Sequence, residues 1–204
     1  MSLSTYAGLQ AAITGIMNIT ASDISSQIAD VITLGETRIS REARTKDGEK
    51  AYATAIASGV LAVPSDYVEM KYLYCSAAPN TPLERRSVEW LYSQYPRVSA
   101  SSGVPRYFAR DATNFVFGPT PDGSYTVTGC YYQKFAALST STNAQFLANP
   151  DLYLFACLAE SEYLIGRDSR VPLWEAKYNK ILQDANGLRE RENISGSTPR
   201  MRNM

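Results

Sequence analysis

The spacing of the hydrophobic residues changes abruptly at Lys46-Asp47-Gly48, and this change restricts the chain to a mixed fold. Before this point the apolar residues recur every three to four positions, which is the period of an amphipathic helix. After it come short apolar or alternating runs at residues 51–57, 60–63 and 67–75, divided by Ser58-Gly59 and Pro64-Ser65. Such runs, broken at glycine, serine and proline, are typical of β-strands joined by turns. The sequence therefore predicts helices first and a β-rich region afterwards.

Two helices are predicted before the change. The first follows the capping residues Ser4 and Thr5, and its apolar residues at helical spacing are Tyr6, Leu9, Ile13, Ile16 and Met17. The second follows Thr20-Ala21-Ser22, is longer, and carries a stripe formed by Ile24, Ile28, Val31, Ile32 and Ile39. Arg41 and Arg44 near its end suit the negative pole of the helix dipole.

The β-rich region contains one predicted short helix, over residues 87–95. Ser87 and Glu89 are favourable at a helix start, and Val88, Leu91 and Tyr92 lie along one side. A serine- and glycine-rich loop at residues 99–103 follows. Further strand-like runs occupy residues 105–110, 114–117 and 124–135.

Residues 115–134, "FVFGPTPDGSYTVTGCYYQK", predict a β-hairpin that turns at Pro121-Asp122-Gly123. Proline presets φ, aspartate hydrogen-bonds the backbone ahead of it, and glycine accepts the left-handed conformation of such turns. Phe115 and Phe117 would then share a sheet face with an alternating set on the partner strand. Because hairpin geometry accounts for every turn residue, Asp122 is interpreted as a structural corner and not as a catalytic carboxylate.

Two more helices are predicted in the carboxyl-terminal part. Asn149-Pro150 followed by Asp151 marks a helix start, and residues 152–158 are apolar on nearly every side, which indicates a buried helix. The last helix begins near Ser169, with a stripe formed by Val171, Trp174, Tyr178, Ile181, Leu182, Ala185 and Leu188. Residues 193–204, "NISGSTPRMRNM", lose all periodicity and are predicted to be a mobile basic tail.

The composition argues against several classes of protein. The 204 residues include 20 basic and 20 acidic ones, so no net charge attracts the chain to nucleic acid or to an anionic membrane. With 45% apolar and 20% charged residues, the chain has the composition of a globular protein. The longest apolar stretch, residues 152–159, is far shorter than the roughly 20 residues of a membrane span. We expect neither a signal peptide nor a membrane anchor.

The residues that usually carry catalysis or bind metals are sparse. Histidine is absent, which removes the usual general base, histidine-containing triads and most zinc sites. Cys75, Cys130 and Cys157 are too far apart for a paired zinc spacing and are expected to be reduced, apolar residues. Neither GxxxxGK[ST] nor GxGxxG occurs. We therefore expect no enzymatic activity, no cofactor and no metal.

Carboxylate pairs leave one route to acid–base chemistry, for example Asp111 with Asp122 or Glu160 with Glu162. Pairs of this kind occur by chance in a chain with 20 acidic residues. Glu160 and Glu162 also stand two positions apart, so they do not face each other on a helix. The pattern favours solvated surface charge over catalysis.

The sequence contains 14 tyrosines, a residue type that is enriched where proteins meet. Taken singly, Tyr131, Tyr132, Tyr153 and Tyr178 are each predicted to be core residues, as are Trp90 and Trp174. The aromatic residues alternate mostly with serine, threonine and alanine and seldom with basic residues, which disfavours a stacking surface for single-stranded nucleic acid.

Five segments resemble the head-to-tail adaptor proteins of short-tailed bacteriophages in their amino-acid sequence, their order and their spacing. They are "DVITLGETRISREAR", "GVLAVPSDYVEMKYL", "GVPRYFARDATNFVFGPTPDGSYTVTGCYYQKFAAL", "NPDLYLFACLAESEYL" and "VPLWEAKYNKIL". The resemblance covers roughly residues 5–190. It implies an α+β fold in which a bundle of four main helices carries an inserted antiparallel β-sheet sub-domain and an extended C-terminal arm. The helical body would be residues 4–46 and 149–192, the insertion residues 51–135 and the arm residues 193–204, all within one adaptor domain.

The resemblance also implies a structural virion protein whose copies form a ring, typically dodecameric, between the portal and the tail nozzle and fibres. It would be assembled in the host cytoplasm and located in the neck of the virion. Genome DNA would pass through its lumen without sequence-specific binding. The portal-binding residues would be Arg189, Arg191, Pro199, Arg200, Met201, Arg202, Asn203 and Met204. The residues facing the tail or a neighbouring copy would be Pro119, Thr120, Pro121, Asp122 and Gly123.

Two alternatives remain open from the sequence. One is a small cell-wall hydrolase that uses carboxylates, which the sequence permits because it contains many acidic residues. The other is a different tail subunit, a nozzle or fibre protein, which would form spikes in place of rings.

Overall fold

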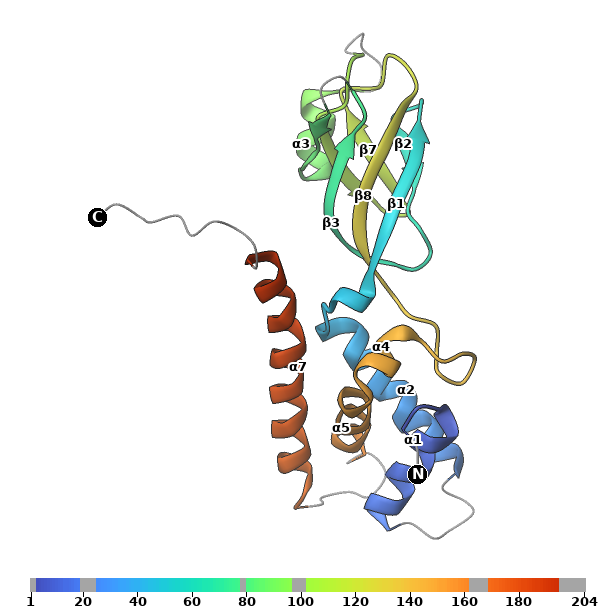
Figure 1. The fold of residues 1–204 in the computed structure, drawn as a ribbon. Coiled ribbons are helices and arrows are strands. Elements are labelled where there is room, and N and C mark those ends of the chain that lie inside the picture. The colour runs from blue at the N-terminus through green and yellow to red at the C-terminus, as the bar shows by residue number, and fades with distance from the viewer. Residues whose placement is uncertain (1–2, 19–24, 78–79, 97–101, 162–168, 195–204) are drawn as a thin grey trace, which may run out of the picture. The chain divides into compact units, whose positions relative to one another are not determined.

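The computed structural model of the chain describes residues 3–18, 25–77, 80–96, 102–161 and 169–194 (Figure 1). The chain forms two compact units. The helical unit contains Met1–Gly48 and Phe135–Met204, and the β unit contains Glu49–Lys134. The predicted mixed α+β fold is confirmed.

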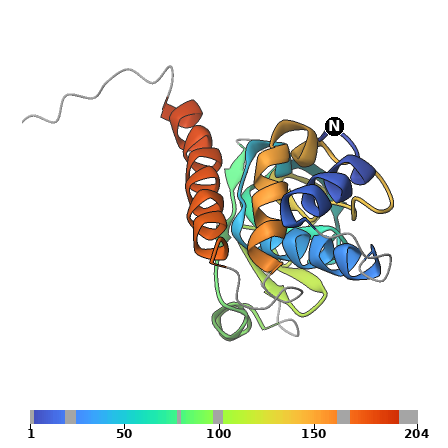
Figure 2. The same ribbon diagram turned by 90° about the horizontal axis from the view of Figure 1, so that it is seen from below.

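The helical unit contains five α-helices and one short 3-10 helix among the described residues. They are α1 (Tyr6–Met17), α2 (Ser25–Glu42), η2 (Lys46–Gly48), α4 (Ala144–Ala148), α5 (Pro150–Glu160) and α7 (Val171–Ile194). Helix α5 packs against α2 on one side and α7 on the other, and α1 contacts both α2 and α5 (Figure 2). The buried segment predicted at residues 152–158 is therefore the central helix of this unit.

The helix ends follow the capping chemistry of their sequences. The Thr5 hydroxyl accepts a hydrogen bond from the Gly8 amide at 3.1 Å, as an N-cap does. Asn149 occupies the N-cap position of α5, but its side chain makes no capping bond. The backbone N–H of Asn149 instead donates to the Gln145 carbonyl at the end of α4. The sequence did not predict α4, because five residues are too few to show a helical period.

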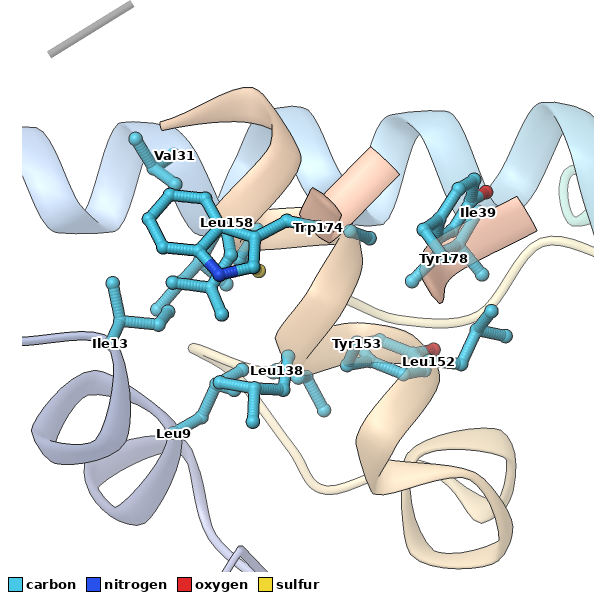
Figure 3. Close-up of a cluster of buried hydrophobic side chains, with 14 of the residues drawn as sticks. Leu9, Ile13, Val31, Ile39, Leu138, Leu152, Tyr153, Leu158, Trp174 and Tyr178 are labelled. Carbon is cyan, nitrogen blue, oxygen red and sulfur yellow. The ribbon is translucent and has the colours of Figure 1, made fainter. Parts of the chain in front are cut away.

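The core of the helical unit joins residues from both ends of the chain. Figure 3 shows Leu9 and Ile13 of α1, Val31 and Ile39 of α2, Leu152 and Leu158 of α5, and Trp174 and Tyr178 of α7. All of these side chains are buried. Burying one such aliphatic side chain contributes about 1.5–3 kcal/mol relative to leaving it in water, so the two parts of the unit stabilise each other.

The β unit contains two four-stranded sheets. Sheet A has the order β1 (Glu49–Ile56), β8 (Tyr125–Gln133), β3 (Tyr67–Cys75) and β4 (Thr81–Pro82). Sheet B has the order β2 (Val60–Ala62), β7 (Asn114–Gly118), β6 (Tyr107–Asp111) and β5 (Glu84–Arg85). Neighbouring strands are antiparallel except for β5 and β6, which are parallel.

The two sheets of the β unit share one hydrophobic core. Ile56, Leu73 and Val127 of sheet A pack with Phe108 and Phe115 of sheet B in a single buried cluster. Because side chains alternate along a strand, the residues next to them in sequence point to the outer faces. On sheet B, the outward residues Ala109 and Val116 pack against Leu91 of helix α3 (Val88–Gln94). Helix α3 therefore covers the outer face of sheet B.

The predicted hairpin of residues 115–134 is wrong. Strand β7 pairs with β2 and β6, whereas β8 pairs with β1 and β3, so residues 119–124 pass from sheet B to sheet A. The prolines at 119 and 121 have no amide to donate to a ladder, which favours such a crossing over a continued strand pair. Phe115, Phe117 and Val127 do face one core, but from two opposed sheets.

Candidate interaction surfaces

Residues 119–123, which belong to the corner segment 119–124, were predicted to contact the tail or a neighbouring copy. Pro121 is buried, and Thr120 accepts a hydrogen bond from the Gly103 amide at 2.8 Å. A Cβ added at Gly59 would lie 3.1 Å from Pro121, and Gly59 has a φ of +72°, so this contact depends on glycine. Asp122 and Gly123 are exposed. The tip of the corner segment is therefore available to a partner.

The predicted portal-binding residues lie at the other end of the chain. Helix α7 continues to Ile194, so Arg189 and Arg191 belong to it, and the helix extends into the first residues of the predicted arm. Residues 195–204 lie outside the described residues. Pro199, Arg200, Met201, Arg202, Asn203 and Met204 are among them.

Three of the four carboxylates that were considered for acid–base chemistry are held by a partner of their own. Asp111 accepts a hydrogen bond from the Tyr92 hydroxyl at 2.7 Å, and Asp122 accepts one from the Tyr125 hydroxyl. Glu160 forms an ion pair with Arg38, and Glu162 lies outside the described residues. Nothing in the described part of the chain joins two of these carboxylates as an acid and a base.

A polar cluster of the helical unit surrounds Arg38 and connects three helices. From α2, the Arg38 guanidinium reaches Glu160 of α5 at 3.3 Å and Glu175 of α7 at 2.8 Å, and lies 4.3 Å from the centre of the Tyr178 ring. The hydrogen bond with Glu175 raises the pKa of Arg38 and lowers that of Glu175. The Tyr178 hydroxyl donates to Glu42 at 2.8 Å. The cluster fixes α7 to α2 and α5.

No metal site is evident in the part of the chain that the structure describes. No group of three or more histidine, cysteine, aspartate or glutamate side chains there could hold a metal ion. A cavity of about 140 Å³ beside α3 and another of about 250 Å³ beside β3 are both smaller than the roughly 300–1,000 Å³ of typical ligand pockets. In the same residues, no helix is both long and apolar enough for a membrane span.

The outer face of sheet A has no covering element among the described residues. We call its exposed, uncharged part the open sheet face, and it consists of Ala51, Ala53, Ala55, Tyr72, Tyr74, Thr126 and Thr128. The next row of the same outer face carries Glu49, Tyr132 and Glu69. Tyr72 and Tyr74 are 49% and 41% exposed. This surface was not predicted from the sequence, although the alternation of alanine along residues 51–55 was a signal for it.

A family comparison assigns the chain to a known group of proteins. The model of the SU10 adaptor protein family matches residues 4–202. The chain belongs to the SU10 adaptor protein family. No curated protein matches the sequence.

This adaptor also has weak structural neighbours. One is a chain from the neck of an empty GTA particle computed with C6 symmetry, with 13% identity over 84% of this chain and 87% of that one. The TM-score is 0.31, which is too low to indicate a shared fold.

The family assignment confirms the predicted class of protein, an adaptor. The predicted cores are also confirmed in part: Tyr131, Tyr132, Tyr153 and Tyr178 are buried, as is Trp174. The three cysteines are free and buried, as expected for reduced apolar residues.

Proposed function

We propose that copies of this adaptor form a ring, dodecameric as in the adaptors it resembles, between the portal and the tail nozzle and fibres of a short-tailed phage. Genome DNA passes through the lumen of the ring. The observation that carries this proposal is the family match over residues 4–202, nearly the whole chain.

The charge of the chain supports passage of DNA. A lumen that neutralised many phosphates would hold the genome, because each neutralised phosphate adds a salt-dependent binding term. This chain has 20 basic and 20 acidic residues and no net charge. A ring of neutral subunits offers DNA a path without a strong electrostatic grip.

We propose that the portal binds the basic carboxyl-terminal end of the chain, which comprises Arg189 and Arg191 of α7 and the arm with Arg200 and Arg202. Because α7 reaches Ile194, the arm is best tested by removing residues 195–204, which leaves the described helix intact. A matched control replaces the same ten residues with a glycine–serine segment of equal length.

The test is sedimentation of the full-length protein mixed with the portal protein of the same phage. The full chain is expected to sediment with the portal as a closed ring complex. The truncated and glycine–serine variants are expected to bind at least about tenfold more weakly, the effect of losing about 1.4 kcal/mol of contact free energy. If the full-length protein does not bind the portal under conditions where virions are stable, the proposed function is wrong.

We further assign a contact with the tail or a neighbouring copy to the exposed tip of the corner segment. Asp122→Lys reverses a charge at an exposed position, whereas Gly123→Ala adds a methyl group where no other atom lies within 4 Å. The first variant is expected to change assembly while the second does not. If both variants assemble as the wild type does, the tip of the corner segment is not part of the interface.

A further inference from the structure

Strand β1 forms an edge of sheet A, and its second side has no partner strand among the described residues (Figure 1). It pairs with β8 over all eight residues from Glu49 to Ile56, without a shift in register. No other hydrogen bond between backbone groups reaches these residues in the described part of the chain. A long, regular and unpaired edge strand is a template for a further strand.

The other edges of the β unit carry the features by which proteins prevent such pairing. Strand β2 has three residues, and β4 and β5 have two each. Strand β4 contains Pro82, and both residues of β5 are charged. Short length, proline and charge all protect the edges of sheets. Strand β1 is long and contains no proline, so it is the edge that these features leave open.

The hydrogen bonds of Thr126 on β8 show which backbone groups of β1 point to its open side. The Thr126 N–H donates to the Ser76 hydroxyl at 2.9 Å, and the Thr126 carbonyl accepts from the Ser76 N–H at 2.8 Å. Both groups of Thr126 therefore point towards the β3 side of β8 and away from β1. Because hydrogen-bonded and non-hydrogen-bonded pairs alternate in an antiparallel ladder, Ala55, which lies opposite Thr126, directs its own N–H and C=O to the open side. The same alternation applies to Ala53 and Ala51.

A second copy of β1 is complementary to this edge. When two β1 strands lie antiparallel with Ala53 opposite its own copy, Ala51 lies opposite Ala55. The N–H and C=O groups of these three alanines then all exchange hydrogen bonds across the seam. Alanine meets alanine on one face of the seam. On the other face Tyr52 lies opposite Thr54, and an aromatic residue opposite a β-branched one stabilises strand pairing.

The charged residues of β1 do not oppose this pairing. In the same register, the Lys50 residues of the two copies lie at opposite ends of the seam, roughly 20 Å apart. Within each copy, Lys50 also pairs with Asp66 at 2.6 Å, and Glu49 pairs with Lys71 at 2.7 Å. Repulsion between like charges across the seam is therefore largely screened.

The lengths of the edges determine the symmetry of the contact. Apart from β1, no described edge strand of the β unit is longer than three residues, so a second copy offers only its own β1 as a strand of matching length. A contact between identical surfaces is two-fold and closes at two copies. We propose that the free adaptor forms a dimer through its β1 edges, in which the two four-stranded sheets A join into one sheet. This inference goes beyond the ring and does not rest on it.

The size of the contact predicts a weak dimer. Strand β2 follows β1 after residues 57–59, so both sheets contribute to this side of the β unit. Eight residues span about 27 Å, and two packed sheets are roughly 20 Å deep, so each copy buries roughly 500 Å². A stable pair of proteins usually buries about 800 Å² on each partner. The dimer therefore covers an edge that would otherwise attract other strands, yet it releases single copies readily.

The first test traps the proposed register with cysteine. Opposite residues of a hydrogen-bonded pair have Cα atoms about 5.5 Å apart, a separation that a disulfide spans. Ala53→Cys in the full-length protein is therefore expected to give a covalent dimer under mild oxidation. Ala55→Cys is the matched control, because the two copies of residue 55 would lie roughly 14 Å apart. The natural cysteines are buried and do not compete. Equal yields of dimer from both variants, or no dimer from either, would overturn the inference.

The second test removes a backbone donor from the edge. Ala53→Pro deletes an N–H that points away from β8, so proline is expected to leave the ladder between β1 and β8 intact, as it does on other edge strands. Ala53→Ser keeps the N–H and is the control. Sedimentation equilibrium of the full-length protein, without the portal, measures association over the micromolar range. The wild type and Ala53→Ser are expected to dimerise, whereas Ala53→Pro raises the dissociation constant at least about tenfold.

The outcomes separate this inference from the proposed function. A wild type that stays monomeric throughout the micromolar range contradicts the dimer, as does an Ala53→Pro variant that dimerises like the wild type. Circular dichroism checks that Ala53→Pro folds, and the cysteine pair tests the contact even where that variant does not fold. Neither test contains the portal, so failure to bind the portal contradicts the proposed function alone.

Discussion

The helical unit and the β unit obtain their cores from the sequence in different ways. In the helical unit, Leu9 and Ile13 near the amino end pack in one cluster with Trp174 and Tyr178 near the carboxyl end. In the β unit, every strand and every core residue lies within Glu49–Lys134. The β unit is thus a continuous insertion in a helical unit that is complete only when both ends of the chain are present.

The connections between the units allow the insertion to be removed by design. Glu49 and Tyr132 are register partners on β1 and β8, so the chain enters and leaves the β unit at the same end of one sheet. In the helical unit, a Cβ added at Gly48 would lie 3.6 Å from the Phe135 ring. The two chain ends at the junction therefore lie close together in each unit, so each unit could be made as a separate protein.

The largest expected effect comes from separating the units. A fragment of residues 49–134 is expected to unfold cooperatively on its own, because its core is complete. A chain in which a short glycine–serine linker joins Gly48 to Phe135 is expected to retain the helical fold. Residues 1–48 alone and residues 135–204 alone are expected to stay unfolded, since each lacks half of its core. Circular dichroism during denaturation measures all four, and an unfolded 49–134 fragment would show that the β core is not sufficient by itself.

The second-largest effect is expected from a substitution that destabilises only the β unit. A Cβ at Gly129 would collide with the Tyr72 carbonyl and lie 3.1 Å from the Leu73 Cα, both of which are backbone atoms. Gly129→Ala is expected to lower the free energy of unfolding of the β unit by about 3 kcal/mol. The measurement is fluorescence, because Trp90 lies in the β unit and Trp174 in the helical unit. A shift in the Trp174 transition of equal size would show that the units are not separate.

The matching substitution in the helical unit is Gly35→Ala. The added Cβ would lie 2.9 Å from the Cys157 sulfur and 3.1 Å from its amide nitrogen, so α2 and α5 must separate. We expect a loss of about 2 kcal/mol from the strain, partly offset by helix propensity. Gly15→Ala in α1 is the control, since nothing lies within 4 Å there, and it should gain up to about 1 kcal/mol. Equal changes in both variants would refute tight packing at Gly35.

The smallest effects concern pH and have opposite signs in the two units. In the helical unit, burial raises the pKa of Glu36, although a hydrogen bond from the Leu138 amide lowers it. In the β unit, burial raises the pKa of Asp66, but hydrogen bonds from Lys50 and Tyr131 outweigh this and lower it. Glu36 therefore contributes stability that is lost as the pH rises through its folded pKa, whereas the contribution of Asp66 is lost as the pH falls.

Two substitutions test these signs. At pH 7, Glu36→Gln is expected to stabilise the helical unit and Asp66→Asn to destabilise the β unit, each by less than about 1 kcal/mol. Both differences should shrink in acid, where the wild-type carboxyl groups are protonated. Unfolding midpoints between pH 3 and pH 7 measure this, and changes of the same sign in both variants would contradict the assignment.

Structural features that depend on residues close together in the sequence, such as helix caps and alternating strands, were predicted correctly. Thr5 and Ser87 cap the helices expected to follow them, and the alternating run at 67–75 is β3. The pairing of β7 with β8 was wrong because two aromatic runs around a proline turn look the same in a hairpin and in a crossing between facing sheets. The open sheet face was missed for a similar reason. Which outer face stays uncovered depends on where α3 packs, and the alternation of alanine along residues 51–55 does not contain that information by itself.

The proposed closed ring of this adaptor on its portal is tested most directly by electron micrographs of the full-length protein bound to the portal. The predicted image is a continuous ring around the portal axis. Separate spikes around the portal, or a portal without added density, would contradict the ring.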